Sequence, residues 1–300
     1  PNGGRITPTV GLAYNSQSSD YGLAGYGIDV TGISVITSGG RDMFHNGKVR
    51  GAKYDSDCNL YLDGKWLVLQ EGEDGMDGAV YSPEGDPHTK VTLHGSYVAG
   101  CMPVFKVSTK DGGRMVYGGD TGSRFEFYKN GTLCCGAWYV CRAENKYGEG
   151  MTYAYTKESL CMRPQSITYG REGALCKIVF AYRQMRQGNE RHFRMSSQQG
   201  VNDKMLASVT TSINGQTYRR YDFTYDETAS DKYSRLTTIT ESNALGESLN
   251  PTMLTWDIPE VNMEISRTDN TDVPQKLSSW KGFDNDRNAG YMTVDLNGDG

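Results

Sequence analysis

The sequence lacks the features that define several large classes of protein. It contains no apolar run of about 18 residues, so no membrane-spanning helix is predicted. The formal net charge is −5 and the cations are dispersed along the chain, which argues against a nucleic-acid partner. Helical periodicity is nearly absent. These absences favour a protein built from sheets and turns.

Motifs that carry catalysis are also missing. There is no G-x-S-x-G elbow, and the four histidines form no H-x-x-x-H pair; they are His45, His88, His94 and His192. Carboxylates gather between Glu71 and Asp77, but charge runs of this kind usually face water. A hydrolase with two facing carboxylates therefore stays a third, least favoured hypothesis. We predict that the chain is not an enzyme and assign no catalytic or cofactor-binding residue.

The pattern of cysteines indicates neither a disulfide framework nor a zinc site. Their number is odd and no C-x-x-C pair occurs; they are Cys58, Cys101, Cys134, Cys135, Cys141, Cys161 and Cys176. We expect mostly free, half-buried thiols. A disulfide from Cys134 or Cys135 to Cys161 or Cys176 is the alternative.

What the chain does contain is glycine, tyrosine and turn signals. The 37 glycines suit tight turns, and the 20 tyrosines suit half-buried sheet surfaces. Dipeptides typical of two-residue hairpin turns separate alternating apolar runs. They are Asp63-Gly64, Asn130-Gly131 and Asn214-Gly215, with Asn46-Gly47 and Asp111-Gly112 as further candidates. The predicted fold is all-β: a large meander of antiparallel hairpins forming a β-sandwich or shell-like sheet.

A change of character near Pro259 predicts a domain boundary. A strand ends at Trp256, and the polar stretch that follows shows no clear hairpin. We therefore divide the chain into a β domain over residues 1–258 and a linker with the start of a new unit over residues 259–300.

The new unit ends in a pattern of oxygen ligands. Asp295, Asn297 and Asp299 stand at alternate positions and are followed by Gly300, as in a loop that wraps a hard cation. These three residues predict part of a Ca²⁺ site whose remaining ligands we expect past residue 300.

The order of several segments resembles a known family. The opening, Gly4 to Ser16, then Gly22 to Asp29, then Ile33 to Ile36, is similar to the opening of the SpvB N-terminal domain family. The same order continues with the later segments 105–118, 138–155, 235–241 and 251–256. The Asp-x-Asn-Gly-Asp-Gly ending is similar to an FG-GAP/VCBS propeller repeat. The SpvB module begins the B subunits of insecticidal toxin complexes and several Rhs-type proteins.

This resemblance implies a structural role. It implies a non-enzymatic shell or scaffold segment of a secreted or cell-surface bacterial protein, which encloses or presents a C-terminal effector. The implied partners are the chain's own downstream propeller and Rhs-type repeats, or a toxin-complex partner subunit. The Salmonella member carries an ADP-ribosyltransferase in a separate domain, but no residue here matches that motif. The alternative reading is an extracellular or cell-surface module that binds carbohydrate or protein through its tyrosines and tryptophans.

Overall fold

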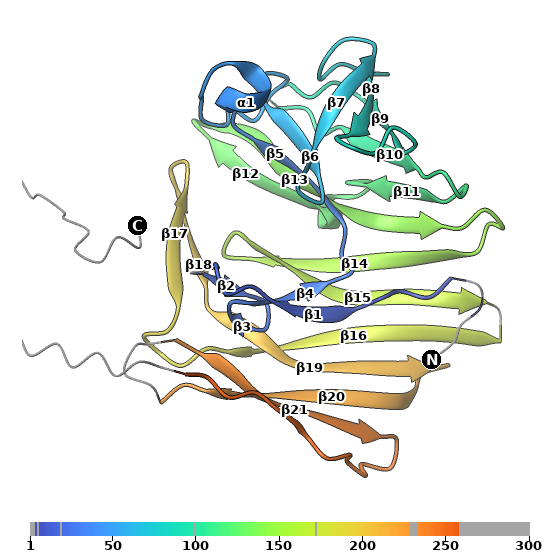
Figure 1. Cartoon of the computed structure of the whole chain (residues 1–300), viewed down its shortest axis with the longest axis vertical. Helices are drawn as coiled ribbons and strands as arrows, with labels where there is room; N and C mark the ends of the chain where they lie inside the picture. Colours follow the sequence, from blue (N-terminus) through green and yellow to red (C-terminus); the bar gives the residue numbers. More distant parts are fainter. Residues whose placement is uncertain are drawn as a thin grey trace, which may run out of the picture. The chain divides into compact units, whose positions relative to one another are not determined.

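The computed structural model describes residues 4, 6–18, 20–98, 100–171, 173–228 and 233–257. All of these residues except residue 257 belong to one compact unit, Pro1–Trp256. The unit is nearly all β, so the predicted fold class is confirmed (Figure 1). The predicted second unit and the propeller repeat lie outside the described residues, and the boundary at residue 258 stays a prediction.

The first part of the chain forms short strands. They are β1 (Gly11–Tyr14), β2 (Tyr21–Gly22), β3 (Gly25–Tyr26), β4 (Ile28–Thr31), β5 (Val35–Gly39), α1 (Met43–Asn46), β6 (Asn59–Leu62), β7 (Lys65–Glu71), β8 (Val80–Pro83), β9 (Lys90–His94), β10 (Val104–Ser108), β11 (Arg114–Tyr117) and the 3₁₀ turn η1 (Thr121–Ser123). The second part forms longer ones. They are β12 (Arg124–Lys129), β13 (Thr132–Glu144), β14 (Gly150–Glu158), β15 (Cys161–Arg171), β16 (Ala174–Gln184), β17 (Arg191–Met195), β18 (Gln198–Asn202), β19 (Lys204–Ile213), β20 (Gln216–Asp226), β21 (Arg235–Asn243) and β22 (Thr252–Met253).

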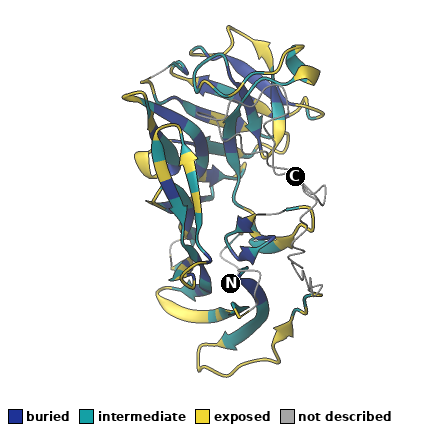
Figure 2. Cartoon of the chain, turned by 90° about the vertical axis from the view of Figure 1, so that its left-hand side faces the viewer, coloured by how far each residue is buried: buried dark blue, intermediate teal, exposed yellow. Residues whose placement is uncertain are grey.

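Strands β5 to β11 close into a barrel through β13. They follow one another in the ladder, β13 pairs with β5, and β13 also pairs with β11. Closure leaves these strands without a free edge. Trp138 lies fully buried in the core, with its ring 5.0 Å from that of Tyr97 and 4.9 Å from that of Phe105. Figure 2 shows buried segments throughout the molecule, whereas many loop tips are exposed.

The sheet continues out of the barrel because β13 is long enough to pair twice. Its C-terminal end pairs with β14, and the ladder then runs through β15, β16, β19, β20, β21 and β22, every pair antiparallel. Burial alternates along these strands. On β16, Ile178 and Phe180 are buried while Lys177 and Val179 are exposed. This half-solvated pattern accounts for the low hydrophobic content of 37%.

The N-terminal segment covers the apolar side of this extended sheet. Strands β1 and β4 form a separate hairpin, and Val10 and Val30 pack against the main core. The amide of Leu206 on β19 donates to the carbonyl of Leu23 at 2.7 Å. An apolar cavity of about 420 Å³ remains between this hairpin and the sheet.

Most of the predicted hairpin turns are confirmed. Asp63-Gly64, Asn130-Gly131 and Asn214-Gly215 all have positive φ at both positions, the signature of type I′ turns. A longer turn that includes Asp111-Gly112 joins β10 to β11. The prediction at Asn46-Gly47 was wrong: Asn46 ends α1, and Gly47 is its left-handed cap at φ 65°. The Asp42 side chain caps the start of that turn, which makes a helix of these residues.

Candidate functional site

A row of hydrogen bonds crosses the extended sheet at Tyr155, Tyr182 and Tyr225, which we call the tyrosine row. Each phenol donates to a backbone carbonyl of the preceding strand, at 2.6 to 2.8 Å. The acceptors are the carbonyl oxygens of Val140, Pro164 and Leu206. Burial raises the pKa of all three phenols above the usual value, so they stay protonated and able to donate.

The residue whose carbonyl accepts from one tyrosine of the row lies directly opposite the preceding tyrosine of the row, on the adjacent strand. Pro164 lies opposite Tyr155, and Leu206 lies opposite Tyr182. Leu236 lies opposite Tyr225, and its carbonyl accepts a bond of 2.8 Å from the indole nitrogen of Trp256. The row is therefore continuous from β13 to the last described residues.

A β-bulge accompanies every step of the row. The register shifts immediately before Tyr155, Tyr182 and Tyr225, so that one residue of the next strand is skipped each time. Bulges bend a strand and increase its twist. Because each bulge lies next to a tyrosine of the row, successive hairpins bend at the point where the tyrosine row crosses them. The arrangement forms a curved wall whose unit is one hairpin with one tyrosine.

A two-stranded arm, β17–β18, leaves the wall between β16 and β19 and reaches toward the barrel (Figure 1). At its tip, the Gln198 side chain accepts from the amide of Tyr128 on β12 at 2.8 Å. The Tyr54 phenol donates to the sulfur of Met195 at 3.4 Å. Among the described strands β12 pairs only with β13, so the arm covers part of the open edge of β12.

A buried arginine lies near the base of the arm. The Arg163 side chain is 2% exposed, and one guanidinium nitrogen donates to the Asn202 side chain at 3.0 Å. Asp203 and Glu158 lie at 3.6 and 4.0 Å from its nitrogens. These carboxylates lie too far to accept hydrogen bonds, and the Nε and Nη1 atoms of Arg163 are buried without a hydrogen-bond partner among the described residues. The bond to Asn202 connects β15 to the end of β18 at the base of the arm.

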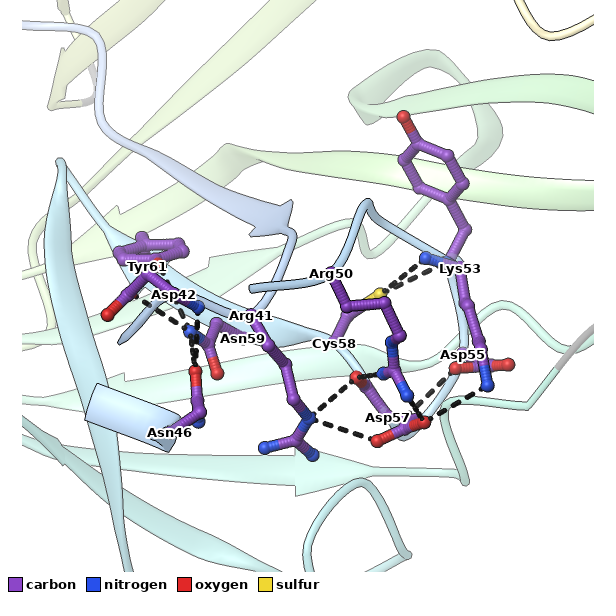
Figure 3. A network of polar contacts seen from close by, with 11 residues as sticks. Arg41, Asp42, Asn46, Arg50, Lys53, Asp55, Asp57, Cys58, Asn59 and Tyr61 are labelled. Atoms are coloured by element: carbon purple, nitrogen blue, oxygen red, sulfur yellow. Dashed lines mark hydrogen bonds and ion pairs between the residues drawn. The ribbon is translucent and has the colours of Figure 1, made fainter. Parts of the chain in front are cut away.

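The polar network in Figure 3 organises the loop between β5 and β6. The Asp57 carboxylate is in contact with Arg41, Arg50 and Lys53, and the hydrogen bond from Arg50 is the main reason why its pKa lies far below the ordinary value. Because Asp57 and Asp55 lie among these cations, the loop carries no concentrated charge of one sign. This network fixes the loop; it offers no open coordination site.

His45 sits in a second cluster next to this loop. Its Nδ1 lies 2.8 Å from Asp42 and its Nε2 3.4 Å from Glu84, while its ring packs at 4.3 Å from that of Trp66. The hydrogen bond with Asp42 is the largest cause that raises the pKa of His45, and Glu84 adds to it. The cluster ties α1 to the end of β8.

The other residues considered from the sequence are not brought together. His88 lies in a loop, His94 ends β9 and His192 lies on the arm. The carboxylates of Glu71, Glu73, Asp74 and Asp77 are exposed, as the solvated-loop interpretation requires. Within the described part of the chain no cluster of histidine, cysteine and carboxylate side chains is placed to hold a metal ion. Asp295, Asn297 and Asp299 lie outside the described residues, so the Ca²⁺ site stays a prediction.

All seven cysteines are free thiols, as expected, and four are buried: Cys58, Cys134, Cys135 and Cys176. Burial raises the pKa of Cys135 to about 12, which makes it a poor nucleophile. None of the described helices is long or apolar enough to cross a bilayer.

Together, the closed barrel, the curved wall and its tyrosine row define an all-β domain built around an extended antiparallel sheet. No known family model matches the sequence. No curated protein matches it by sequence either.

Solved structures do match the fold. The N-terminal domain of effector protein SpvB from Salmonella typhimurium strain LT2 superposes with a TM-score of 0.63 at 14% identity, covering 81% of this chain and 96% of that one. A chain of the TcdB2-TccC3-Cdc42 crystal structure gives a TM-score of 0.66 at 14% identity over 85% of this chain. A chain of the Photorhabdus luminescens Tc holotoxin pore gives 0.63 at 13% identity over 85%.

The predicted resemblance to the SpvB N-terminal domain is therefore confirmed at the level of fold. The chain spans only 15% of the length of each of the two toxin-complex chains.

Proposed function

We propose that this chain is a non-enzymatic wall segment of a secreted toxin-complex or Rhs-like protein, which helps to enclose or present a C-terminal effector. The observation that carries the proposal is the tyrosine row: one ladder leaves a closed barrel and bends at the same level in successive hairpins. A wall that encloses another polypeptide needs such regular curvature and few free edges. The similarity to the SpvB domain and to toxin-complex chains supports the same function.

The proposed partners are a downstream propeller and Rhs-type repeats of the same protein, or a toxin-complex partner subunit. The barrel closes one end of the ladder, so the described ladder ends at the other side, in β20, β21 and β22. Further wall strands would continue from there.

Protease protection in the full-length protein tests the proposal. We expect the C-terminal polypeptide to resist proteolysis in the native protein and to become sensitive when Tyr155→Phe and Tyr182→Phe are combined. Tyr128→Phe is the matched control, because Tyr128 is 52% exposed and lies outside the row. Rapid digestion of the C-terminal polypeptide in the native protein, at the rate of the same polypeptide alone, would refute enclosure.

The alternative of a binding module that uses stacked aromatic rings has less support. Trp138 is fully buried, and the row tyrosines are committed to backbone carbonyls. The exposed tyrosines are dispersed over separate elements; they are Tyr14 on β1, Tyr128 on β12, Tyr147 in the β13–β14 turn and Tyr218 on β20. They do not form one stacking platform.

A further inference from the structure

The outward face of the barrel carries a cluster of cations on β9, β10, β11 and β13. Burial alternates on these strands: Leu93 and Phe105 point into the core, while their neighbours His94 and Lys106 are exposed. The exposed side chains here include the cations Lys90, Lys106, Arg114 and Arg142 and the imidazole of His94, which together we call the basic face. All except Lys90 line an open hollow of about 590 Å³.

The strand register distributes these cations diagonally. Lys106 lies opposite Thr92 on β9 and opposite Val116 on β11. Along β9, Lys90 and His94 each lie two residues from Thr92, and along β11 Arg114 lies two residues from Val116. Arg142 on β13 lies opposite Val116. Diagonal neighbours in a sheet are about 7–8 Å apart at the Cα level. The basic face is therefore a regular lattice of charge with Lys106 near its centre.

This charge is poorly neutralised. Among the described lining residues Glu144 is the one carboxylate, and it pairs with Arg142. Lys90, Lys106 and Arg114 form no ion pair with any described residue. Because the chain as a whole carries −5, the face differs in sign from the rest of the molecule. A concentrated field of this kind attracts anionic partners.

The chemistry of the lining narrows the choice of anion. Its described residues include the hydroxyls of Thr92 and Ser108, the imidazole of His94 and the apolar side chains of Val107, Met115 and Val116, but no Phe, Tyr or Trp. Protein interfaces usually centre on aromatic or apolar anchors, and single-stranded nucleic acids stack their bases on aromatic rings. Among the described residues no ring of Phe, Tyr or Trp lines this hollow, and the apolar residues Met115 and Val116 are themselves half-buried. What remains is recognition of repeated anionic groups, for which Arg supplies forked donors and Lys point charges.

We propose that the basic face binds a linear sulfated polysaccharide, with successive sulfate groups placed on the diagonal cations. Sulfate takes bidentate hydrogen bonds from guanidinium, and the spacing along the lattice suits a chain with regularly repeated charge. This proposal does not depend on the wall function, because the face points away from the barrel core and lies outside the tyrosine row.

Calorimetric titration of the purified chain with a heparin oligosaccharide tests the proposal. We expect saturable binding that weakens as salt is raised, since exposed charges are screened. The double variant Lys106→Glu with Arg114→Glu should lose affinity by about tenfold or more. Lys177→Glu, an exposed charge reversal on β16, should bind like the parent chain. Desulfated heparin should not bind.

Several results would overturn the proposal. They are absence of heparin binding at low salt, unchanged affinity in the double variant, or equal loss in Lys177→Glu. Equal competition by polyglutamate or by a DNA oligonucleotide would show a general anion effect. Unfolding midpoints measured for each variant identify a folding defect. If the double variant is misfolded, the single variant Lys90→Glu, at an exposed position, must show the loss of heparin affinity. Protease protection is not expected to change in any of these variants.

Discussion

Removing single hydroxyl groups from the tyrosine row should lower stability by a predictable amount. In Tyr155→Phe the ring is kept, but the 2.6 Å bond to the carbonyl of Val140 is lost. Tyr182→Phe and Tyr225→Phe remove the equivalent bonds to Pro164 and Leu206. A buried hydrogen bond whose acceptor is left without that donor costs about 1–2 kcal/mol. Each variant should therefore lose about 1–2 kcal/mol in free energy of unfolding.

The sum is large relative to total stability. If the three sites act independently, the triple variant loses about 3–6 kcal/mol, out of about 5–15 kcal/mol for a typical domain. Urea denaturation followed by circular dichroism measures this loss, with an unchanged slope showing that the same surface is exposed. Tyr128→Phe should change stability by less than about 0.5 kcal/mol, because this ring is 52% exposed.

The row also predicts how stability depends on alkaline pH. The folded pKa of the three phenols is raised above the usual 10, so their contribution is complete below pH 10. It should be lost as pH rises above 10, since the unfolded chain then releases protons that the folded chain retains. If the three Phe variants were no less stable than Tyr128→Phe, the hydroxyl bonds would contribute nothing and the bulges alone would set the curvature.

Three further predictions concern other parts of the molecule. The folded pKa of His45 is raised, so the stabilisation from its contact with Glu84 should be complete below pH 6.5 and should fade as pH rises through the raised pKa. An NMR titration should show a lower pKa for His45 in Glu84→Gln than in the parent chain. Buried Cys135, with a pKa of about 12, should resist an alkylating reagent at pH 8, while exposed Cys101 reacts first, as peptide mass spectrometry would show. Gly215→Ala should cost about 1–2 kcal/mol, because this turn residue has φ 80° and its added Cβ touches nothing, which isolates the backbone strain.

Each of these has a result that contradicts it. An unchanged His45 pKa in Glu84→Gln would remove the link between α1 and β8. Alkylation of Cys135 as fast as Cys101 would show that the barrel core opens readily. An unaltered unfolding midpoint in Gly215→Ala would mean that the turn adopts another type.

The sequence predicts well what local chemistry decides. Asn130-Gly131 and Asn214-Gly215 form the expected turns because asparagine and glycine tolerate positive φ without any tertiary help. The hairpin prediction at Asn46-Gly47 is wrong because residues that tolerate positive φ also end helices. The hydrogen bond from the backbone of His45 to the Asp42 side chain favours a helical turn here instead of a hairpin.

Features that depend on distant pairing are not visible in the sequence. The closure of β11 on β13 and the placement of Lys90 and Arg142 around Lys106 on the basic face depend on the register of long-range ladders. The signal for the tyrosine row is present as the repeated aromatic-x-tyrosine pattern that ends at Tyr155, Tyr182 and Tyr225. Its uneven spacing hides the repeat, because the arm is inserted between the second and third members.

The position of the N-terminal hairpin has a consequence for synthesis on the ribosome. The barrel strands are neighbours in sequence and can pair as they emerge, and each later hairpin adds to the one before it. The N-terminal segment must wait, because Leu23 bonds to Leu206 and Tyr26 to Ser234. Such distant contacts form slowly and leave apolar surface uncovered meanwhile. The β1–β4 segment is translated before the strands that it contacts and is therefore among the last of the described elements to fold, and a nascent chain stalled before β19 should be a substrate for chaperones.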